Sequence, residues 1–269
     1  MKLYSRDYND LTEEELEKWN TLKESQAAHK IGSIEVKESN YPNLPKTLRH
    51  YLSLFPNNYL DILASNNLEQ LQLLINQFSS LLNETSSTEQ TMLNFIREKE
   101  AYFIIASLFD NYRFGHHDAY IFPEFQLGTD YRVDFLLVGE GSGGYQFIFV
   151  ELEDPYKKIV LKDGNLGEAF RKGIIQISDW RRWLSSEFQS LSRTFEKYKS
   201  RNATLKKEFM RFDPSRCHFA VVAGRRSDFN KNKEKTYRIS REHEHQGIKL
   251  FHYDNLIDFS KSVIRRRTY

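Results

Sequence analysis

The sequence is poor in cysteine and has no long apolar run. Cys217 is the single cysteine, so no disulfide can form within the chain, which suits a reducing cytosol. Cys217 adjoins an apolar run, and we interpret its thiol as a small buried hydrophobic group. No apolar segment approaches the roughly 18 residues of a membrane span, and the N-terminus lacks the apolar core of a signal peptide. We therefore expect a cytoplasmic protein without a membrane partner.

Several ligand classes also lack their usual motifs. The glycines between residues 141 and 144 lack the strand–loop–helix context of a loop that cradles phosphate. His243 and His245 would diverge on a helix, which argues against a zinc site. The formal net charge is only +2, so any attraction to nucleic acid has to be local.

At 269 residues, the chain is long enough for one large domain or for a domain with an extension. It is rich in aromatic residues, with 20 Phe, 15 Tyr and 3 Trp, which supply ample material for a core. Residues 1–85 are predicted to form a helical extension that serves assembly or regulation. Its predicted elements are a helix after the capping box of Thr12 and Glu15, a short strand over 31–36, a helix with Leu48, Leu52 and Phe55, and an amphipathic helix from Leu68 to Leu82.

Residues 86–269 predict an α/β fold with a mixed sheet. A second capping box, Ser86 with Glu89, opens this part of the chain. The predicted elements are a helix from Met92 to Ile104, a strand over 119–127 in which Pro123 indicates an edge or a bulge, a hairpin over 131–155, a long helix from Asn165 to about Gln189, a strand over 216–223, a charged and partly helical segment over 225–244, a strand over 248–253 and a helix over 255–265.

The predicted hairpin, YRVDFLLVGEGSGGYQFIFVELEDP, organises the rest of the chain. Its second strand is nearly all apolar, as expected of a central strand that is covered on both faces. Nevertheless Asp134 lies inside the first strand, and Glu151 and Glu153 close the second. Because side chains alternate along a strand, Glu151 and Glu153 share one face. A buried carboxylate is costly unless a positive group meets it, and the simplest such group is a divalent metal.

The residue types favour a hard cation. Mg²⁺ prefers carboxylate and water oxygens, and Asp134 and Glu151 would supply them from neighbouring strands, with the backbone carbonyl of Leu152. Such a metal neutralises a phosphodiester and lowers the pKa of a bound water. The alternative is that each acid pairs with a basic side chain, for instance Arg132 or Lys157.

The order of elements from Glu89 to Ala223 resembles the core of the PD-(D/E)xK nucleases. PEFQLGTDYRVDFLLV, YQFIFVELEDP, the helix that carries Gln176 and the terminal YDNL segment more narrowly resemble the Shedu family of prokaryotic anti-phage nucleases. The resemblance covers about the last two-thirds of the chain. It implies a restriction-endonuclease-like sheet in a nuclease domain over 86–269, and a Mg²⁺- or Mn²⁺-dependent DNA endonuclease or nickase that forms a homo-oligomer.

The resemblance also implies roles for single residues. Asp134 and Glu151 match the metal-binding acids, and Glu89 matches the helix acid that reaches back towards the metals. Its alternative role is that of the capping-box glutamate. Gln176 and Trp180 are similar to the Gln-x-x-x-Tyr feature of RecB-related nucleases, in which the glutamine supports the site. Trp180 could stack on a base, or it could belong to the core beside a Gln at the solvent edge.

Glu153 stands where the common motif has lysine. It is then an extra ligand or a base, or a lysine comes from elsewhere, with Lys172, Lys157 and Lys158 as candidates. The substitution leaves open a second hypothesis, a module that binds DNA without turnover. A third hypothesis, a carboxylate-pair glycosidase, conflicts with strands this apolar. Basic residues predicted to contact DNA phosphates are Arg171, Lys172, Arg225 and Arg226.

Overall fold

The fold is built on one mixed sheet of five strands, which stand in the order β1-β2-β3-β4-β5. The computed structural model describes residues 3–27, 43–63, 67–230, 233–264, 266 and 268–269. The strands are β1 (Asp118–Leu127), β2 (Tyr131–Gly141), β3 (Gly144–Leu152), β4 (Cys217–Val222) and β5 (Ile248–Phe251). β1, β2 and β3 form an antiparallel meander, whereas β4 and β5 run parallel to β3 and to each other. The predicted strand at 31–36 lies outside the described residues.

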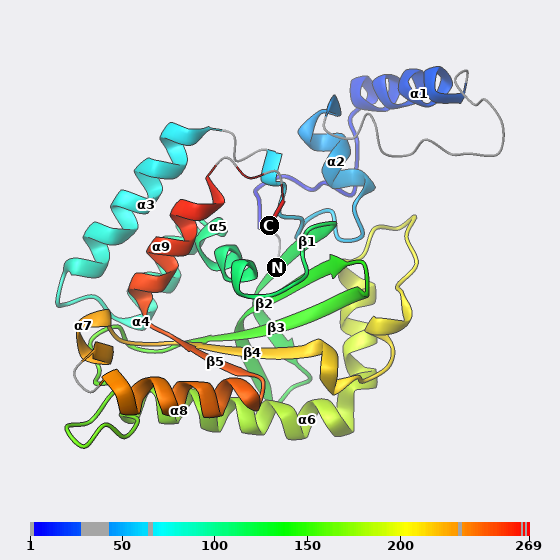
Figure 1. The fold of residues 1–269 in the computed structure, drawn as a ribbon. Coiled ribbons are helices and arrows are strands. Elements are labelled where there is room, and N and C mark those ends of the chain that lie inside the picture. Colours follow the sequence, from blue (N-terminus) through cyan, green and yellow to red (C-terminus); the bar gives the residue numbers. More distant parts are fainter. Residues whose placement is uncertain (1–2, 28–42, 64–66, 231–232, 265, 267) are drawn as a thin grey trace.

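Helices cover both faces of the sheet (Figure 1). One face carries α6 (Glu168–Tyr198) and α8 (Lys233–His245), which are the crossovers between the parallel strands. The other face carries α3 (Leu68–Asn83), α4 (Glu89–Glu98), α5 (Phe103–Ala106) and α9 (Tyr253–Val263). Further elements within the described residues are α1 (Glu13–Ala27), α2 (Lys46–Leu52), α7 (Arg226–Phe229) and 3₁₀ turns over 107–111, 207–209 and 214–216. This arrangement confirms the predicted mixed α/β fold.

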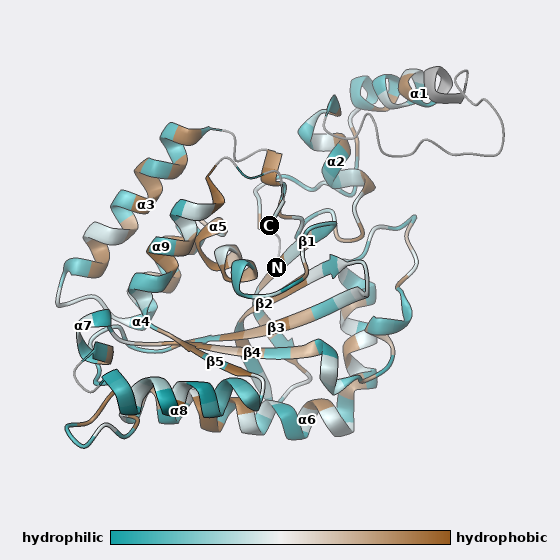
Figure 2. Ribbon diagram, in the orientation of Figure 1, coloured by the Kyte–Doolittle hydropathy of each residue, from teal (hydrophilic) through white to brown (hydrophobic). Residues whose placement is uncertain are grey.

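The core lies in two layers, one on each face of the sheet. Alternate residues of β3 divide between them: Phe147 and Phe149 pack in the layer under α6, whereas Ile148 and Val150 pack under α4, α5 and α9. Figure 2 shows the apolar strands between helices whose outer faces are hydrophilic, most clearly at α8. Within the described residues, no helix is both long enough and apolar enough to cross a bilayer.

The alternation of side chains slips by one residue in the middle of β1 and β2. In β1, Phe122 and Phe125 pack in the same core layer, although they are three residues apart. In β2, Val133 and Leu136 do the same. Glu124, between the two phenylalanines, has a φ of 47°. β1 is the edge strand of the sheet, which confirms the predicted edge at Pro123, and the register on both sides of Glu124 contains no extra residue, so there is no bulge.

Several predicted helix boundaries are wrong. The helix predicted from Met92 to Ile104 is divided into α4 and α5, because the chain leaves the helical conformation between them, where Glu100 has a φ of 49°. The capping box of α4 is formed by Thr88 and Thr91, not by Ser86 and Glu89. Ser87 is already used at the end of α3, where its hydroxyl donates to the Leu81 carbonyl at 2.6 Å, so the new helix begins two residues later than predicted. α6 continues to Tyr198 because its buried stripe is extended by Leu191 and Phe195.

Part of the N-terminal segment pairs with the free edge of β1. Tyr59 forms an antiparallel bridge with Tyr120. The Leu60 amide donates to the Ala119 carbonyl at 2.8 Å, and the Ile121 amide donates to the Asn58 carbonyl at 3.0 Å. Residues before position 86 therefore contact the sheet directly. The division into an extension over 1–85 and a domain over 86–269 stays a prediction.

Gly173 sets the distance between α6 and the sheet. A Cβ at this position would lie 2.6 Å from the Val221 Cγ1 atom of β4. Gly173→Ala adds helix propensity worth about 1 kcal/mol, but we expect the overlap to cost more and to lower the free energy of unfolding by about 1–2 kcal/mol. Urea denaturation measures this change. Gly143→Ala is the control, because a Cβ there meets nothing within 4 Å. Equal effects at the two positions would contradict the prediction.

Candidate metal and nuclease site

Asp134 and Glu151 face each other across neighbouring strands. The pairing of β2 with β3 runs to Phe135 opposite Val150, and one further step in this register places Asp134 opposite Glu151. The Asp134 Oδ2 atom accepts a hydrogen bond from the Leu152 amide at 2.8 Å, which fixes its carboxylate beside the end of β3. The hairpin therefore brings together the two acids that the sequence predicted as a pair.

The Glu151 side chain is buried, and that of Asp134 is half-buried. Burial raises the pKa of Glu151 to about 9, and the charges of Asp134 and Glu153 add to this, while a hydrogen bond from Gln176 opposes it. Burial also raises the pKa of Asp134 to about 7, against the effect of the Leu152 amide. Like charges close together disfavour ionisation, so each acid stabilises the protonated form of the other.

The predicted alternative, in which each acid pairs with its own basic residue, does not hold for this pair. Among the described residues, neither Asp134 nor Glu151 forms a salt bridge. Arg132 instead reaches Glu124, with its Nη1 atom 3.1 Å from Oε1. Lys157 reaches Glu168, with its Nζ atom 3.3 Å from Oε1. Within the described ranges, the two facing carboxylates thus have no salt-bridge partner.

Glu153 does have a cationic partner, and this partner comes from α6. The Lys172 Nζ atom lies 2.9 Å from the Glu153 Oε2 atom. The Glu153 side chain is only 2% exposed, whereas that of Lys172 is 52% exposed, so the lysine enters the site from the solvent side. Burial raises the pKa of Glu153, and the hydrogen bond from Lys172 opposes this shift. Of the three candidate lysines, Lys172 is the one that contacts the acids.

Gln176 and Glu89 complete the cluster from the two opposite layers. Gln176 lies one helical turn after Lys172 on α6, and its side chain lowers the pKa of Glu151. Glu89 is the first residue of α4, and because Thr88 and Thr91 cap the helix, the Glu89 carboxylate is free of the capping role. Burial raises the pKa of Glu89, and the nearby charge of Lys172 opposes this shift. The structure thus brings together Asp134, Glu151, Glu153, Gln176, Glu89 and Lys172.

Three buried oxygens of this cluster have no hydrogen-bond partner within the described chain: Glu151 Oε2, Glu153 Oε1 and Gln176 Oε1. A buried polar atom without a partner costs about 1–3 kcal/mol. Oxygen donors of this kind are the ones that Mg²⁺ and Mn²⁺ take. In the part of the chain that the structure describes, no three His, Cys, Asp or Glu side chains form a ready-made metal cage. Asp134 and Glu151 therefore fit a metal that takes its other ligands from water and a phosphate.

The predicted DNA contacts are only partly available. Trp180 is 1% exposed and packs in the core layer under α6, so its rings have no face on which a base could stack, and the predicted stacking role is wrong. Arg225 donates to both carboxylate oxygens of Asp254 and to the Leu82 carbonyl, which uses its charge inside the protein. Arg226 forms a salt bridge with Asp258. Arg171 is exposed on α6, beside Lys172.

Sequence reasoning missed Glu124. By the register of β1 with β2, Glu124 stands opposite Asp134, between the pairs Pro123–Phe135 and Phe125–Val133. It forms salt bridges with Arg132 and with Arg97 of α4. The signal that could have found it is Pro123, which marks the edge strand one residue earlier.

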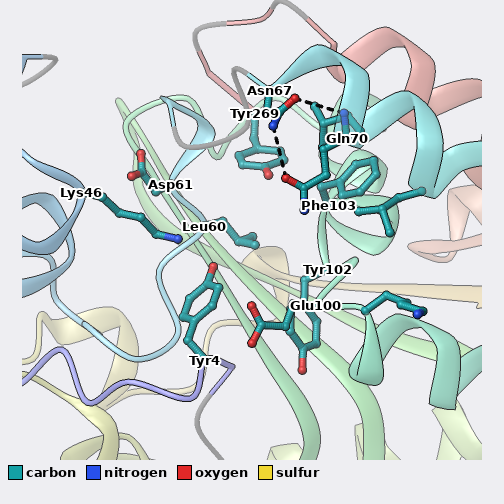
Figure 3. Close-up of a pocket in the computed structure, with 13 residues that line it drawn as sticks. Tyr4, Lys46, Leu60, Asp61, Asn67, Gln70, Glu100, Tyr102, Phe103 and Tyr269 are labelled. Carbon is teal, nitrogen blue, oxygen red and sulfur yellow. Dashed lines mark hydrogen bonds between the residues drawn. The ribbon is translucent and has the colours of Figure 1, made fainter.

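A cavity of about 200 Å³ lies apart from these acids, between the start of α3, the start of α5 and residues near the N-terminus (Figure 3). Its charged lining residues are Lys46, Asp61, Lys99 and Glu100. None of the residues predicted for the nuclease site lines it, so the chemistry of the two places is separate.

The family comparison agrees with the geometry. No curated protein matches the chain. Residues 86–257, which hold the whole acid cluster, match the family model described as Shedu protein SduA, C-terminal. The match spans well over half of the 269 residues. The chain therefore belongs to the Shedu family of anti-phage defence nucleases.

Proposed function

We propose that this protein is a Mg²⁺- or Mn²⁺-dependent DNA endonuclease or nickase that acts in prokaryotic anti-phage defence. The observation that carries the proposal is the facing pair of Asp134, which is half-buried, and Glu151, which is buried, with no salt-bridge partner in the described chain. Structural acids in a core are ordinarily paired or neutralised, so an unpaired facing pair with raised pKa values is typical of a functional site.

Asp134, Glu151 and the backbone carbonyl of Leu152 would hold the metal. When bound, it neutralises the phosphate and lowers the pKa of a coordinated water. The protein's own groups prepare this place. The Leu152 amide orients the Asp134 carboxylate, and Gln176 orients that of Glu151. Glu89 adds an acid from the opposite helical layer.

Lys172 takes the part of the lysine that the common motif places at position 153. Its ammonium group is 2.9 Å from the carboxylate that occupies this position, so the positive charge arrives at the site from α6 instead of β3. A cation there can orient a water molecule and stabilise the negative charge that develops when this water loses its proton. This supports turnover over the alternative of a binding module.

Exposed basic residues beside the acids would hold the DNA. Arg171 and Lys172 are on the exposed side of α6, and Lys157 and Lys158 are exposed in the loop that follows β3. Contacts of lysine and arginine with phosphates are independent of sequence and weaken with salt. Assembly into a homo-oligomer through residues 1–85 is part of the same proposal.

Asp134→Asn is expected to reduce cleavage of supercoiled plasmid DNA by about 10³-fold or more, because it removes a metal-binding charge worth several kcal/mol in the transition state. The measurement is the rate of nicked and linear product on a gel, in Mg²⁺ and in Mn²⁺. Asp130→Asn is the matched control, since Asp130 is exposed in the turn between β1 and β2.

Two results would decide against this proposal. Unchanged cleavage by Asp134→Asn would remove the metal site from the reaction. Binding of both metal and DNA by the parent protein, with no product from supercoiled, linear or single-stranded DNA, would favour the module without turnover.

A further inference from the structure

Glu124 has an unusual backbone conformation at a position that faces the candidate metal site. In the part of the chain that the structure describes, Glu100 and Glu124 are the two residues other than glycine with a positive φ, 49° and 47°. The left-handed region costs an ordinary side chain roughly 1 kcal/mol or more. Glycine would fit position 124 without this cost. With glutamate at this position the backbone is strained, but the residue supplies a carboxylate, which glycine would not.

The strain is built into both strands at the level of Asp134. The side-chain alternation of β1 slips between Phe122 and Phe125, and that of β2 slips between Val133 and Leu136. The register places Glu124 opposite Asp134, in the middle of both slips. The left-handed residue Glu124 thus stands beside Asp134 at the point where the side-chain alternation of both strands slips.

The carboxylate of Glu124 also forms a salt bridge with Arg132, the arginine that is closest in sequence to Asp134. Arg132 is two residues before Asp134, and its charge lowers the Asp134 pKa against the dominant effect of burial. Its Nη1 atom lies 3.1 Å from the Glu124 Oε1 atom, and Arg97 of α4 reaches the second oxygen at 3.7 Å. Arg132 is 60% exposed and its side chain is long, so without Glu124 it would be free to turn to Asp134.

We propose that Glu124 is a positioning residue: it holds Arg132 away from Asp134 and so keeps the Asp134 carboxylate available to a divalent cation. This inference rests on the proposed metal site. Glu124 acts through Arg132 and through the shape of β1, and it is not itself a ligand. Any cation of the protein that paired with Asp134 would compete directly with the metal.

The test is the affinity for Mn²⁺ alone, measured by titration calorimetry at constant pH. We expect Glu124→Gln to weaken Mn²⁺ binding about tenfold or more, because the released Arg132 competes for Asp134. In the double variant Glu124→Gln/Arg132→Gln, affinity is expected to return to within about threefold of the parent. Arg132→Gln alone should also stay within about threefold, since Glu124 already holds this arginine.

The controls separate this inference from the proposed function. If the parent binds no Mn²⁺, or if Asp134→Asn binds it as tightly as the parent, the metal site itself is wrong. If the parent binds and Glu124→Gln binds equally well, only the role of Glu124 is wrong. A double variant that stays as weak as Glu124→Gln would show that the arginine is not the competitor. Should Glu124→Gln fail to fold, Arg132→Gln decides, because tenfold tighter binding would show that the arginine already contacts Asp134.

Discussion

Glu151→Gln is expected to make the metal-free protein more stable and the loaded protein inactive. The folded-state pKa of Glu151, about 9, lies far above the value of about 4.5 for a free glutamate. Between these values the folded protein binds more protons than the unfolded chain, so the free energy of unfolding falls as pH rises through this window. Glutamine has nearly the same shape and carries no titrating group, which removes this loss.

The size of the effect follows from the shift. One pKa unit corresponds to about 1.4 kcal/mol, and after allowance for relaxation and for the changed contact with Gln176 we expect a gain of about 2–3 kcal/mol at pH 8. Urea denaturation in EDTA at pH 5 and pH 8 measures it, and the gain should be small at pH 5. The same substitution should reduce DNA cleavage by about 10³-fold or more.

Glu187→Gln provides the matched control, since Glu187 is exposed on α6. It should leave both stability and cleavage unchanged at both pH values. A loss of stability in Glu151→Gln at pH 8 would mean that the buried charge is compensated within the protein, and would contradict the idea that a metal supplies the missing partner.

The second large effect is expected for Lys172→Met, which should lower kcat by about 10²–10³-fold, the usual range for loss of one group that stabilises charge in the transition state. Methionine keeps much of the apolar stem and removes the ammonium group that lies 2.9 Å from Glu153. KM for DNA should change much less than kcat, because a single phosphate contact contributes only part of the binding. Single-turnover cleavage rates at several DNA concentrations separate the two quantities.

Moving the lysine tests the same idea from the other side. In the double variant Lys172→Met/Glu153→Lys, the cation returns to the strand position that the common motif uses, and part of the lost rate should be recovered. Arg171→Met is the control for the loss of a positive charge on α6, since Arg171 is exposed beside Lys172. If Arg171→Met and Lys172→Met lower kcat equally, Lys172 acts only through its positive charge on α6 and has no specific role beside Glu153.

Most of the sheet could be predicted because its signals are local. The period of two, the glycines at the turn and the acids near the strand ends fixed the hairpin, and the register then follows from the turn, so Asp134 meets Glu151. The helix start of α4 could not be decided this way, because Ser86–Glu89 and Thr88–Thr91 have the same spacing. The deciding contact, from Ser87 to the Leu81 carbonyl, belongs to the previous helix.

The parts of the site that depend on packing were not predictable from one strand or helix. Lys172, Lys157 and Lys158 were equivalent candidates in the sequence, and the crossover of α6 decides among them. The spacing of Gln176 and Trp180 places them on one side of a helix, but it does not indicate which of the two side chains is buried in the core. In the structure, the tryptophan is in the core and the glutamine reaches Glu151.

Lys172 and Gln176 lie near Gly173, where α6 packs so tightly on Val221 of β4 that a Cβ would overlap with it. The two side chains that contact the acids are therefore held by the same helix, and the distance of this helix from β4 depends on the absence of a methyl group at position 173. A substitution of Gly173 by a larger residue would move α6 outward, and would therefore separate both Lys172 and Gln176 from the acids at once. Such a chain would keep every polar residue of the motif and yet lose its nuclease activity. The amino acid at position 173 should therefore be inspected whenever a relative with an intact acid pair is found inactive.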